Sequence, residues 1–350
     1  MEIADVYLGT EKTGATVANR AEVTAIDPAA HQVTVADGPG EKTIEYSRLL
    51  LATGSRAKTI PGADDSPRVH VLRSAEDYVS LRADVAAGTE VAVIGGGYIA
   101  AELAASLNTV GAKVKVCFAG EKLLDHLLPD EIATHVAEVY GGKGIELNAG
   151  FFATSIDASD PQRPVVHGRD NLKVGADVVV LALGAEPVTE LAQAAGLEFI
   201  GDGVKVDARL ETSAPDVWAA GDIAAFPDAL LGTRRVEHVA AASAMGSIAG
   251  KNMTGSLDRF TDTPMFFSDL FDDGFEAVGM TSTSLDVRVF RNSEKAAAVV
   301  YYLDGNVVKG VLLWNTFGHT DDAVEVMEKT KAGTIGQADL ERQIVPGGEG

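Results

Sequence analysis

Residues 91–102, which read VAVIGGGYIAAE, decide the fold. The first four residues form an apolar run with the composition of a buried strand, and the last five have the composition of a helix opening. Between them stand Gly95, Gly96 and Gly97. Such glycines permit a tight turn and let a pyrophosphate approach the free amides at the start of a helix. The order of strand, turn and helix predicts a dinucleotide-binding unit, although a glycine-rich structural corner is the alternative.

The type of dinucleotide is less clearly encoded. An acidic residue about 20 positions further on usually binds the ribose hydroxyls of NAD. Phe118 stands at the end of the next strand instead, and Glu121 or Lys122 from the following loop would have to replace the acid. We therefore expect NAD(P)H as the ligand, with only a slight preference for NADH.

Composition narrows the class of protein. The 350 residues are 46% hydrophobic and 23% charged, as in an ordinary globular protein. The formal net charge of −22 disfavours nucleic acid, and the apolar runs are too short to span a bilayer. Cys117 is the one cysteine in the sequence, which excludes dithiol–disulfide exchange within the chain. The histidines lack ligand spacing, so no metal site is expected, and no glycine-flanked serine turn predicts a hydrolase.

Strands and helices alternate around the glycine turn, which predicts an α/β fold with a parallel sheet. Residues 259–340 return to β-rich segments followed by a helix and predict an α+β domain. A linker between domains is expected near Pro61-Gly62.

Separated segments of the chain resemble the pyridine-nucleotide flavoprotein reductases, most closely the apoptosis-inducing factor and ferredoxin-reductase-like branch. The segments are Leu50 to Gly54, Gly95 to Ala104, Leu183 to Pro187, Ala219 to Asp222, Arg234 to His238, Phe266 to Leu270 and Leu313 to Asn315. The resemblance implies two Rossmann-like three-layer domains, for FAD and for NAD, and a C-terminal α+β domain that closes over the flavin. The FAD-binding domain would comprise 1–68 and 188–258, with the NAD(P)-binding domain at 69–187 inserted and the α+β domain at 259–350.

The resemblance also implies roles on the flavin side. Asp222 resembles the aspartate that binds the ribityl chain, although aspartate is also a favoured helix N-cap. The backbone of Val23 would meet the adenine, Arg73 would lie near the flavin, and His238 and Val239 would lie beside the isoalloxazine. The alternative for His238 is a buried histidine with structural partners.

On the nicotinamide side, Tyr98 resembles an aromatic gate, with Ile99 beside it and Glu102 one turn later on the same helix face. Glu237 and Gly184 resemble further nicotinamide contacts. In the C-terminal domain, Phe267, Glu276 and Asn315 match positions near the cofactors, although Phe267 stands where tryptophan is usual. Tyr98, Glu102 and His238 are the expected catalytic residues.

Members of this family begin with a further strand, glycine turn and helix that hold the FAD pyrophosphate, and the sequence opens after that motif. The loss of charge-assisted hydrogen bonds would cost roughly 1.5–3 kcal/mol each. Three hypotheses follow: an FAD-dependent NAD(P)H oxidoreductase that reduces a ferredoxin, another small redox protein or a quinone; a flavin-less NADH-binding regulatory or docking protein; and a truncated, non-functional fragment. The expected location is the cytoplasm, or the mitochondrion for a eukaryotic member lacking its amino terminus, and a homodimer is possible.

Overall fold

The computed structural model describes residues 13–38 and 40–348, which form two compact units. Unit 1 comprises residues 13–55, 187–227 and 233–261 of the described chain, and unit 2 comprises 56–186, 228–232 and 262–348. The expected α/β fold class is confirmed. The division into four segments stays a prediction, and each unit is described by itself.

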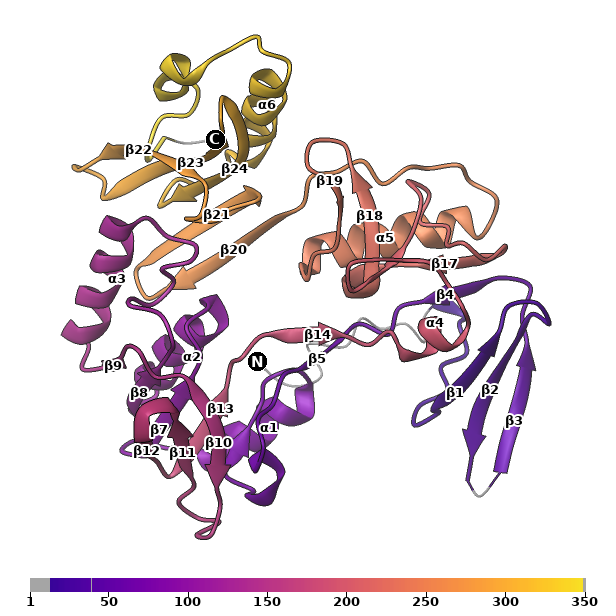
Figure 1. Ribbon diagram of the computed structural model, residues 1–350, viewed down its shortest axis with the longest axis horizontal. Coiled ribbons are helices and arrows are strands. Elements are labelled where there is room, and N and C mark those ends of the chain that lie inside the picture. Colours follow the sequence, from indigo (N-terminus) through magenta and orange to yellow (C-terminus); the bar gives the residue numbers. More distant parts are fainter. Residues whose placement is uncertain (1–12, 39, 349–350) are drawn as a thin grey trace. The chain divides into compact units, whose positions relative to one another are not determined.

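Unit 2 is built on a parallel sheet in the order β6-β13-β7-β8-β9. Its strands are β6 (Val69–His70), β13 (Val178–Leu181), β7 (Glu90–Ile94), β8 (Lys113–Cys117) and β9 (Glu146–Asn148). Figure 1 labels the strands β7, β8, β9 and β13 of this sheet. Strands β7 and β13 are almost wholly apolar and buried, as expected where both faces of a sheet are covered.

The two faces of this sheet have different covers. The helices α2 (Tyr98–Thr109) and α3 (Asp130–Gly142) pack on the face of Val93 and Val116. The opposite face, with Ile94 and Val179, packs against an antiparallel sheet of β10 (Ala153–Asp157), β11 (Val165–Gly168) and β12 (Lys173–Gly175). Three layers result, with the parallel sheet in the middle.

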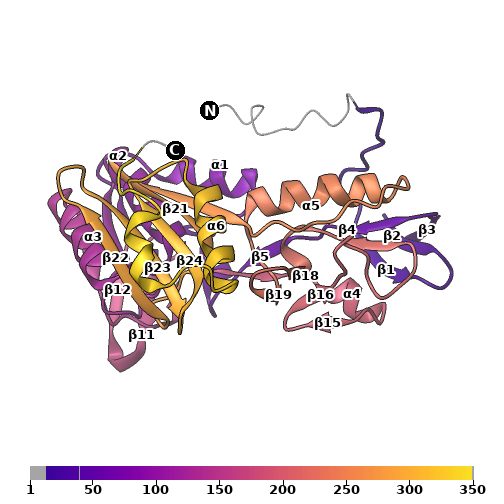
Figure 2. The ribbon, with the colours of Figure 1, turned by 90° about the horizontal axis from the view of Figure 1, so that it is seen from above.

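The C-terminal part of unit 2 is a five-stranded antiparallel sheet in the order β20-β21-β24-β23-β22. The strands are β20 (Met265–Leu270), β21 (Asp273–Gly279), β22 (Asp286–Asn292), β23 (Ala297–Asp304) and β24 (Val307–Trp314). Helix α6 (Thr320–Lys331) covers one face, as Figure 2 shows. The other face shares a core with α2 and α3, and the Tyr302 hydroxyl donates to the Leu127 carbonyl at 2.5 Å.

Unit 1 holds a meander of β1 (Val23–Asp27), β2 (Gln32–Asp37) and β3 (Gly40–Glu45). Strand β4 (Leu49–Leu51) pairs in parallel with β17 (Val217–Ala219). A further sheet orders β15 (Phe199–Ile200), β16 (Gly203–Lys205), β18 (Ala224–Asp228) and β19 (Gly232–Arg234). The helices are α4 (Glu190–Ala194) and α5 (Val239–Asn252), and α5 packs its Ala241, Met245 and Ala249 into the core. Strands β5 (Ser55–Ala57) and β14 (Ala185–Pro187) pair where the chain passes between the units.

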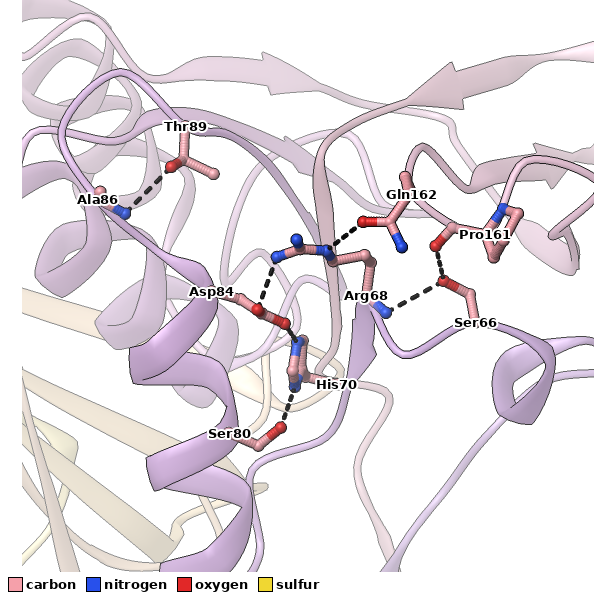
Figure 3. Close-up of polar contacts among 9 residues, drawn as sticks. All are labelled: Ser66, Arg68, His70, Ser80, Asp84, Ala86, Thr89, Pro161 and Gln162. Carbon is pink, nitrogen blue, oxygen red and sulfur yellow. Dashed lines mark hydrogen bonds and ion pairs between the residues drawn. The ribbon is translucent and has the colours of Figure 1, made fainter.

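A polar network ties helix α1 (Ala75–Asp84) to the strand that precedes it (Figure 3). The carboxylate of Asp84 accepts from Arg68 at 2.6 Å and lies 3.0 Å from Nε2 of His70, which is 6% exposed. The Ser80 hydroxyl lies 3.5 Å from Nδ1 of the same ring. Ser80 stands inside a helix rather than on a strand-to-helix turn, so this Ser–His–Asp line is structural rather than hydrolytic.

We expect Asp84→Ala to lower the free energy of unfolding by about 1–3 kcal/mol, because a buried histidine and an arginine lose their shared acceptor. Urea denaturation followed by far-UV circular dichroism measures this loss. Ser80→Ala is the matched control and should cost below about 0.5 kcal/mol. Equal stability of the two variants would contradict the role assigned to Asp84.

Candidate nucleotide-binding sites

The glycine turn opens onto a cavity at the carboxyl edge of the parallel sheet in unit 2. Its volume is about 400 Å³. The lining comes from the turn itself, from the loops after β8 and β9, and from the end of β13: Ile94, Gly95, Gly96, Gly97, Cys117, Phe118, Ala119, Gly120, Lys122, Asp125, His126, Phe151, Phe152, Ala153, Ala182, Leu183 and Gly184. Loops after adjacent parallel strands meet at one edge, which is where such sheets bind ligands.

The three glycines make different contributions to this cavity. Gly95 has a φ of +145°, and its amide donates to the Cys117 carbonyl at 2.9 Å. A Cβ on Gly96 would lie 3.0 Å from that of Phe118. Gly97 is the N-cap of α2, and a Cβ there would meet no protein atom within 4 Å. The space in front of the helix amides is therefore open, as a bound diphosphate requires.

The loop after β8 places one of the two expected ribose-side residues in the cavity. Lys122 lines it, although the ammonium group pairs with Asp130 and donates to the Thr134 hydroxyl at 2.9 Å. Glu121 is exposed, and its amide donates to Asp125 at 2.8 Å. Phe118, at the position usual for an acid, is 3% exposed. Position 118 thus holds an aromatic ring where a carboxylate is usual. The charged side chain that this loop places in the cavity wall at the expected ribose side is that of Lys122.

Tyr98 and Glu102 face β20. The Tyr98 ring lies 5.8 Å from that of Phe266, and Glu102 accepts from the Ser268 hydroxyl at 2.6 Å. Burial raises the pKa of the Glu102 carboxyl, and the Ser268 hydrogen bond opposes this effect. Ile99, between them, is 41% exposed. Both expected catalytic residues of unit 2 therefore lie where α2 packs on the C-terminal sheet.

The remaining expected residues of unit 2 are dispersed. Phe267 is 63% exposed and stands opposite Glu276, whose carboxylate accepts from the Gly318 amide at 2.9 Å. Asn315 donates to Asp273 at 2.8 Å and to the Ala296 carbonyl at 3.0 Å, and accepts from Gly274. Arg73 precedes α1, where its amide donates to Asp77. Asn315 thus has a structural role in the loops of the C-terminal sheet.

Apart from Val23, the expected flavin-side residues of unit 1 lie near the carboxyl ends of β4 and β17. These strands are parallel neighbours, so the turns after them meet at one edge. Asp222 follows β17 in a short 3-10 helix whose N-cap is Ala220, and its carboxylate accepts from the hydroxyl of Ser55, after β4. Asp222 is therefore not a helix N-cap, which was the alternative to its flavin role.

Arg235 organises the rest of this edge. Its guanidinium donates to the Asp222 carbonyl at 3.0 Å and to the Glu237 carboxylate at 2.8 Å. His238 is the N-cap of α5, and Val239, 85% exposed, begins that helix. Val23 lies apart, at the start of β1 in the meander, and is 37% exposed. Polar acceptors, a helix start and an exposed apolar residue on one edge suit a ligand with a polar chain and a flat ring.

His238 stays neutral in the folded protein. Burial, together with the positive charge of Arg234, lowers the pKa of its imidazole to about 4. The unfolded chain titrates near 6.5, so between these values only the unfolded state binds the proton. The stability contributed by the neutral ring is complete above pH 6.5 and is lost as the pH falls through 4.

We expect His238→Gln to remove this part of the pH dependence. The free-energy difference between wild type and variant should change by about 2 kcal/mol between pH 7 and pH 4.5. Urea titrations of both proteins at the two pH values provide the measurement. A difference that does not vary with pH would contradict a buried, neutral His238.

Sequence reasoning missed several residues of the nucleotide cavity, chiefly Asp125, His126, Phe151 and Phe152. The available signal was position, because each follows the end of a strand of the parallel sheet. Among the residues that the structure describes, no three histidine, cysteine or acidic side chains gather as a metal site would require. None of the helices in residues 13–38 and 40–348 has the length and apolar character to cross a membrane.

Comparisons with known proteins agree with this geometry. Residues 3–246 match the family model described as pyridine nucleotide-disulphide oxidoreductase. The chain is 32% identical over 286 residues to the anthranilate 1,2-dioxygenase system ferredoxin--NAD(+) reductase component of Burkholderia cepacia, covering 81% of this chain and 69% of that relative. It is 31% identical to apoptosis-inducing factor 1, mitochondrial, of Dictyostelium discoideum, covering 83% of this chain and 58% of that relative.

A solved structure gives the same result. The crystal structure of the covalent putidaredoxin reductase-putidaredoxin complex superposes with a TM-score of 0.81 at 26% identity, covering 93% of this chain and 79% of the other. The resemblance inferred from the sequence motifs is thereby confirmed. The chain belongs to the pyridine nucleotide-disulphide oxidoreductase family.

Proposed function

We propose that the protein is an FAD-dependent NAD(P)H oxidoreductase that delivers electrons to a ferredoxin, a similar small redox protein or a quinone. The observation that carries the proposal is the open space before Gly97, at the start of α2 and inside a cavity of about 400 Å³. The relatives include ferredoxin--NAD(+) reductase components of dioxygenase systems, which supports the choice of acceptor.

In this proposal, Gly95, Gly96 and Gly97 hold the pyrophosphate of the dinucleotide against the backbone amides of α2. Gly184 and Ile99 contact the nicotinamide half of the dinucleotide. Lys122 and the neighbouring Glu121 contact the adenosine ribose. Tyr98 gates the nicotinamide. Glu102 lies one turn further along α2, and burial raises the pKa of its carboxyl.

Unit 1 would bind FAD. Asp222 would accept hydrogen bonds from the ribityl chain, while His238 and Val239 would border the ring and Glu237 the nicotinamide. Val23 would meet the adenine. Four residues of unit 2 are proposed as further cofactor contacts: Arg73, Phe267, Glu276 and Asn315. Bound FAD would supply hydride acceptance and stepwise electron release. The neutral imidazole of His238 would add no positive charge beside the ring at pH 7.

Electrons would leave the chain without passing through a disulfide. Cys117, the one cysteine of the sequence, lies buried in the cavity wall. Burial raises the pKa of its thiol to about 12, so the reactive thiolate is scarce near pH 7. Cys117 is therefore not proposed as an electron acceptor. We further propose NADH as the preferred donor, a cytoplasmic location and a homodimer.

A spectrum separates this proposal from the other candidate, a flavin-less NADH-binding protein. We expect the purified protein to be yellow, and its flavin absorbance to bleach when NADH is added without oxygen. A colourless protein that still binds NADH would favour the regulatory or docking protein. A protein that binds neither would refute both candidates.

A further inference from the structure

An arginine and a phenylalanine form a stacked pair at one end of the nucleotide cavity. Phe152 lines the cavity and is 44% exposed. The guanidinium carbon of Arg169 lies 3.7 Å from the centroid of its ring, and the Arg169 amide donates to the Phe152 carbonyl at 3.0 Å. One face of the ring is therefore covered by a planar cation that favours such stacking. The exposed part of Phe152 that lines the cavity remains available to a ligand.

The backbone of the β11–β12 turn fixes this pair. Asp170 and Asn171 have φ values of +57° and +59°, a left-handed conformation that costs energy in residues other than glycine. Just before them, a Cβ on Gly168 would lie 3.2 Å from the ring of Phe151. The tight turn and the hydrogen bond from the Arg169 amide to the Phe152 carbonyl place the exposed Arg169 side chain over the Phe152 ring.

The order of the strands places this pair on the adenosine side. A dinucleotide with its pyrophosphate at the glycine turn after β7 spans the strand ends on either side of that turn. Gly184 follows β13, which is the neighbour of β7 on one side. Phe152 follows β9, which lies beyond β8 on the other side. With the nicotinamide half toward Gly184, the adenine reaches the side of Phe152.

We propose that Phe152 is the stacking platform for the adenine ring and that Arg169 is its positioning residue. The inference rests on the proposed function, because it requires a dinucleotide in this cavity. It implies that the adenosine half of the dinucleotide contributes to binding through its base, since stacking on an aromatic ring favours a flat base at that position. A nicotinamide mononucleotide fills the other half of the cavity and gains nothing from the platform.

Isothermal titration calorimetry with ADP-ribose and with nicotinamide mononucleotide tests this. We expect Phe152→Ala to raise the Kd for ADP-ribose by about tenfold and to leave the Kd for the mononucleotide unchanged. Arg169→Ala should raise the Kd for ADP-ribose by about threefold, again without an effect on the mononucleotide. The control is Phe317→Ala, which removes a ring that is 50% exposed in the same unit and does not line the cavity.

The outcomes separate the two proposals. If wild type binds ADP-ribose and Phe152→Ala binds it equally well, the platform is refuted and the proposed function stands. If both ligands weaken equally, the platform is also refuted, because the cavity as a whole has changed. If wild type does not bind ADP-ribose, both proposals fail. Should Phe152→Ala not fold, Phe152→Leu keeps an apolar side chain without the aromatic face and should give the same tenfold loss.

Discussion

Gly97→Val should raise the Kd for NADH at least about 100-fold while changing the free energy of unfolding by less than about 1 kcal/mol. The backbone of Gly97 is extended, with φ −87° and ψ −179°, so valine adopts it without strain. Its Cβ would meet no protein atom within 4 Å. The added methyl groups would instead occupy the cavity before the amides of α2, where the diphosphate has to lie.

Gly336→Val is the matched control for this variant. Gly336 also caps a helix in unit 2 with an extended backbone, φ −118° and ψ −177°, and a Cβ there meets nothing within 4 Å. It lies outside the nucleotide cavity. We expect it to bind NADH as wild type does, in titrations of nicotinamide fluorescence with any flavin removed. Unchanged affinity in Gly97→Val would refute the assignment of the turn.

The centre of unit 2 was predictable because its signals are local. A run of apolar residues, the glycines and an alanine-rich opening identify β7, the turn and α2 from adjacent residues alone. The same local patterns predict a helix near residues 129–140 and a strand over 114–118, and the structure has α3 (Asp130–Gly142) and β8 (Lys113–Cys117) there. Both boundaries moved by one or two residues, as helix and strand ends commonly do.

The surroundings of the cavity were not predictable, because they depend on contacts between distant segments. The β10–β12 sheet has short strands, and nothing local indicates that Phe152 and Arg169 stack. The contact of Glu102 with Ser268 joins residues 166 positions apart. Family resemblance suggested a nicotinamide role for Glu102, but its packing on β20 required the structure.

The family resemblance also could not distinguish ligand contacts from structural ones. Asn315 matches a cofactor-side position, yet its amide bridges Asp273 and the Ala296 carbonyl. It has a φ of +47°, a conformation that asparagine tolerates better than most residues. A residue type required for backbone geometry matches a motif as well as one required for binding. Assigning Asn315 to the cofactor therefore stays a prediction.

Gly95→Val should lower the stability of the fold as well as ligand binding, although Gly95 stands only two residues before Gly97. We expect it to lower the free energy of unfolding by about 4 kcal/mol or more, or to prevent soluble expression. Gly95 has a φ of +145°, which valine cannot adopt without strain, and a Cβ there would lie 2.1 Å from the Ala182 carbonyl oxygen.

The neighbouring backbone has little freedom to relieve this clash. The Ala182 amide donates to the Ile94 carbonyl at 2.8 Å, and the Gly95 amide donates to the Cys117 carbonyl at 2.9 Å, so three parallel strands fix the turn. Urea denaturation of Gly95→Val and Gly97→Val measures the difference. We expect Gly95→Val to lose stability, and Gly97→Val to keep its stability but lose NADH binding. A Gly95→Val protein as stable as wild type would contradict the turn geometry, and the open space before Gly97 would then have no structural basis.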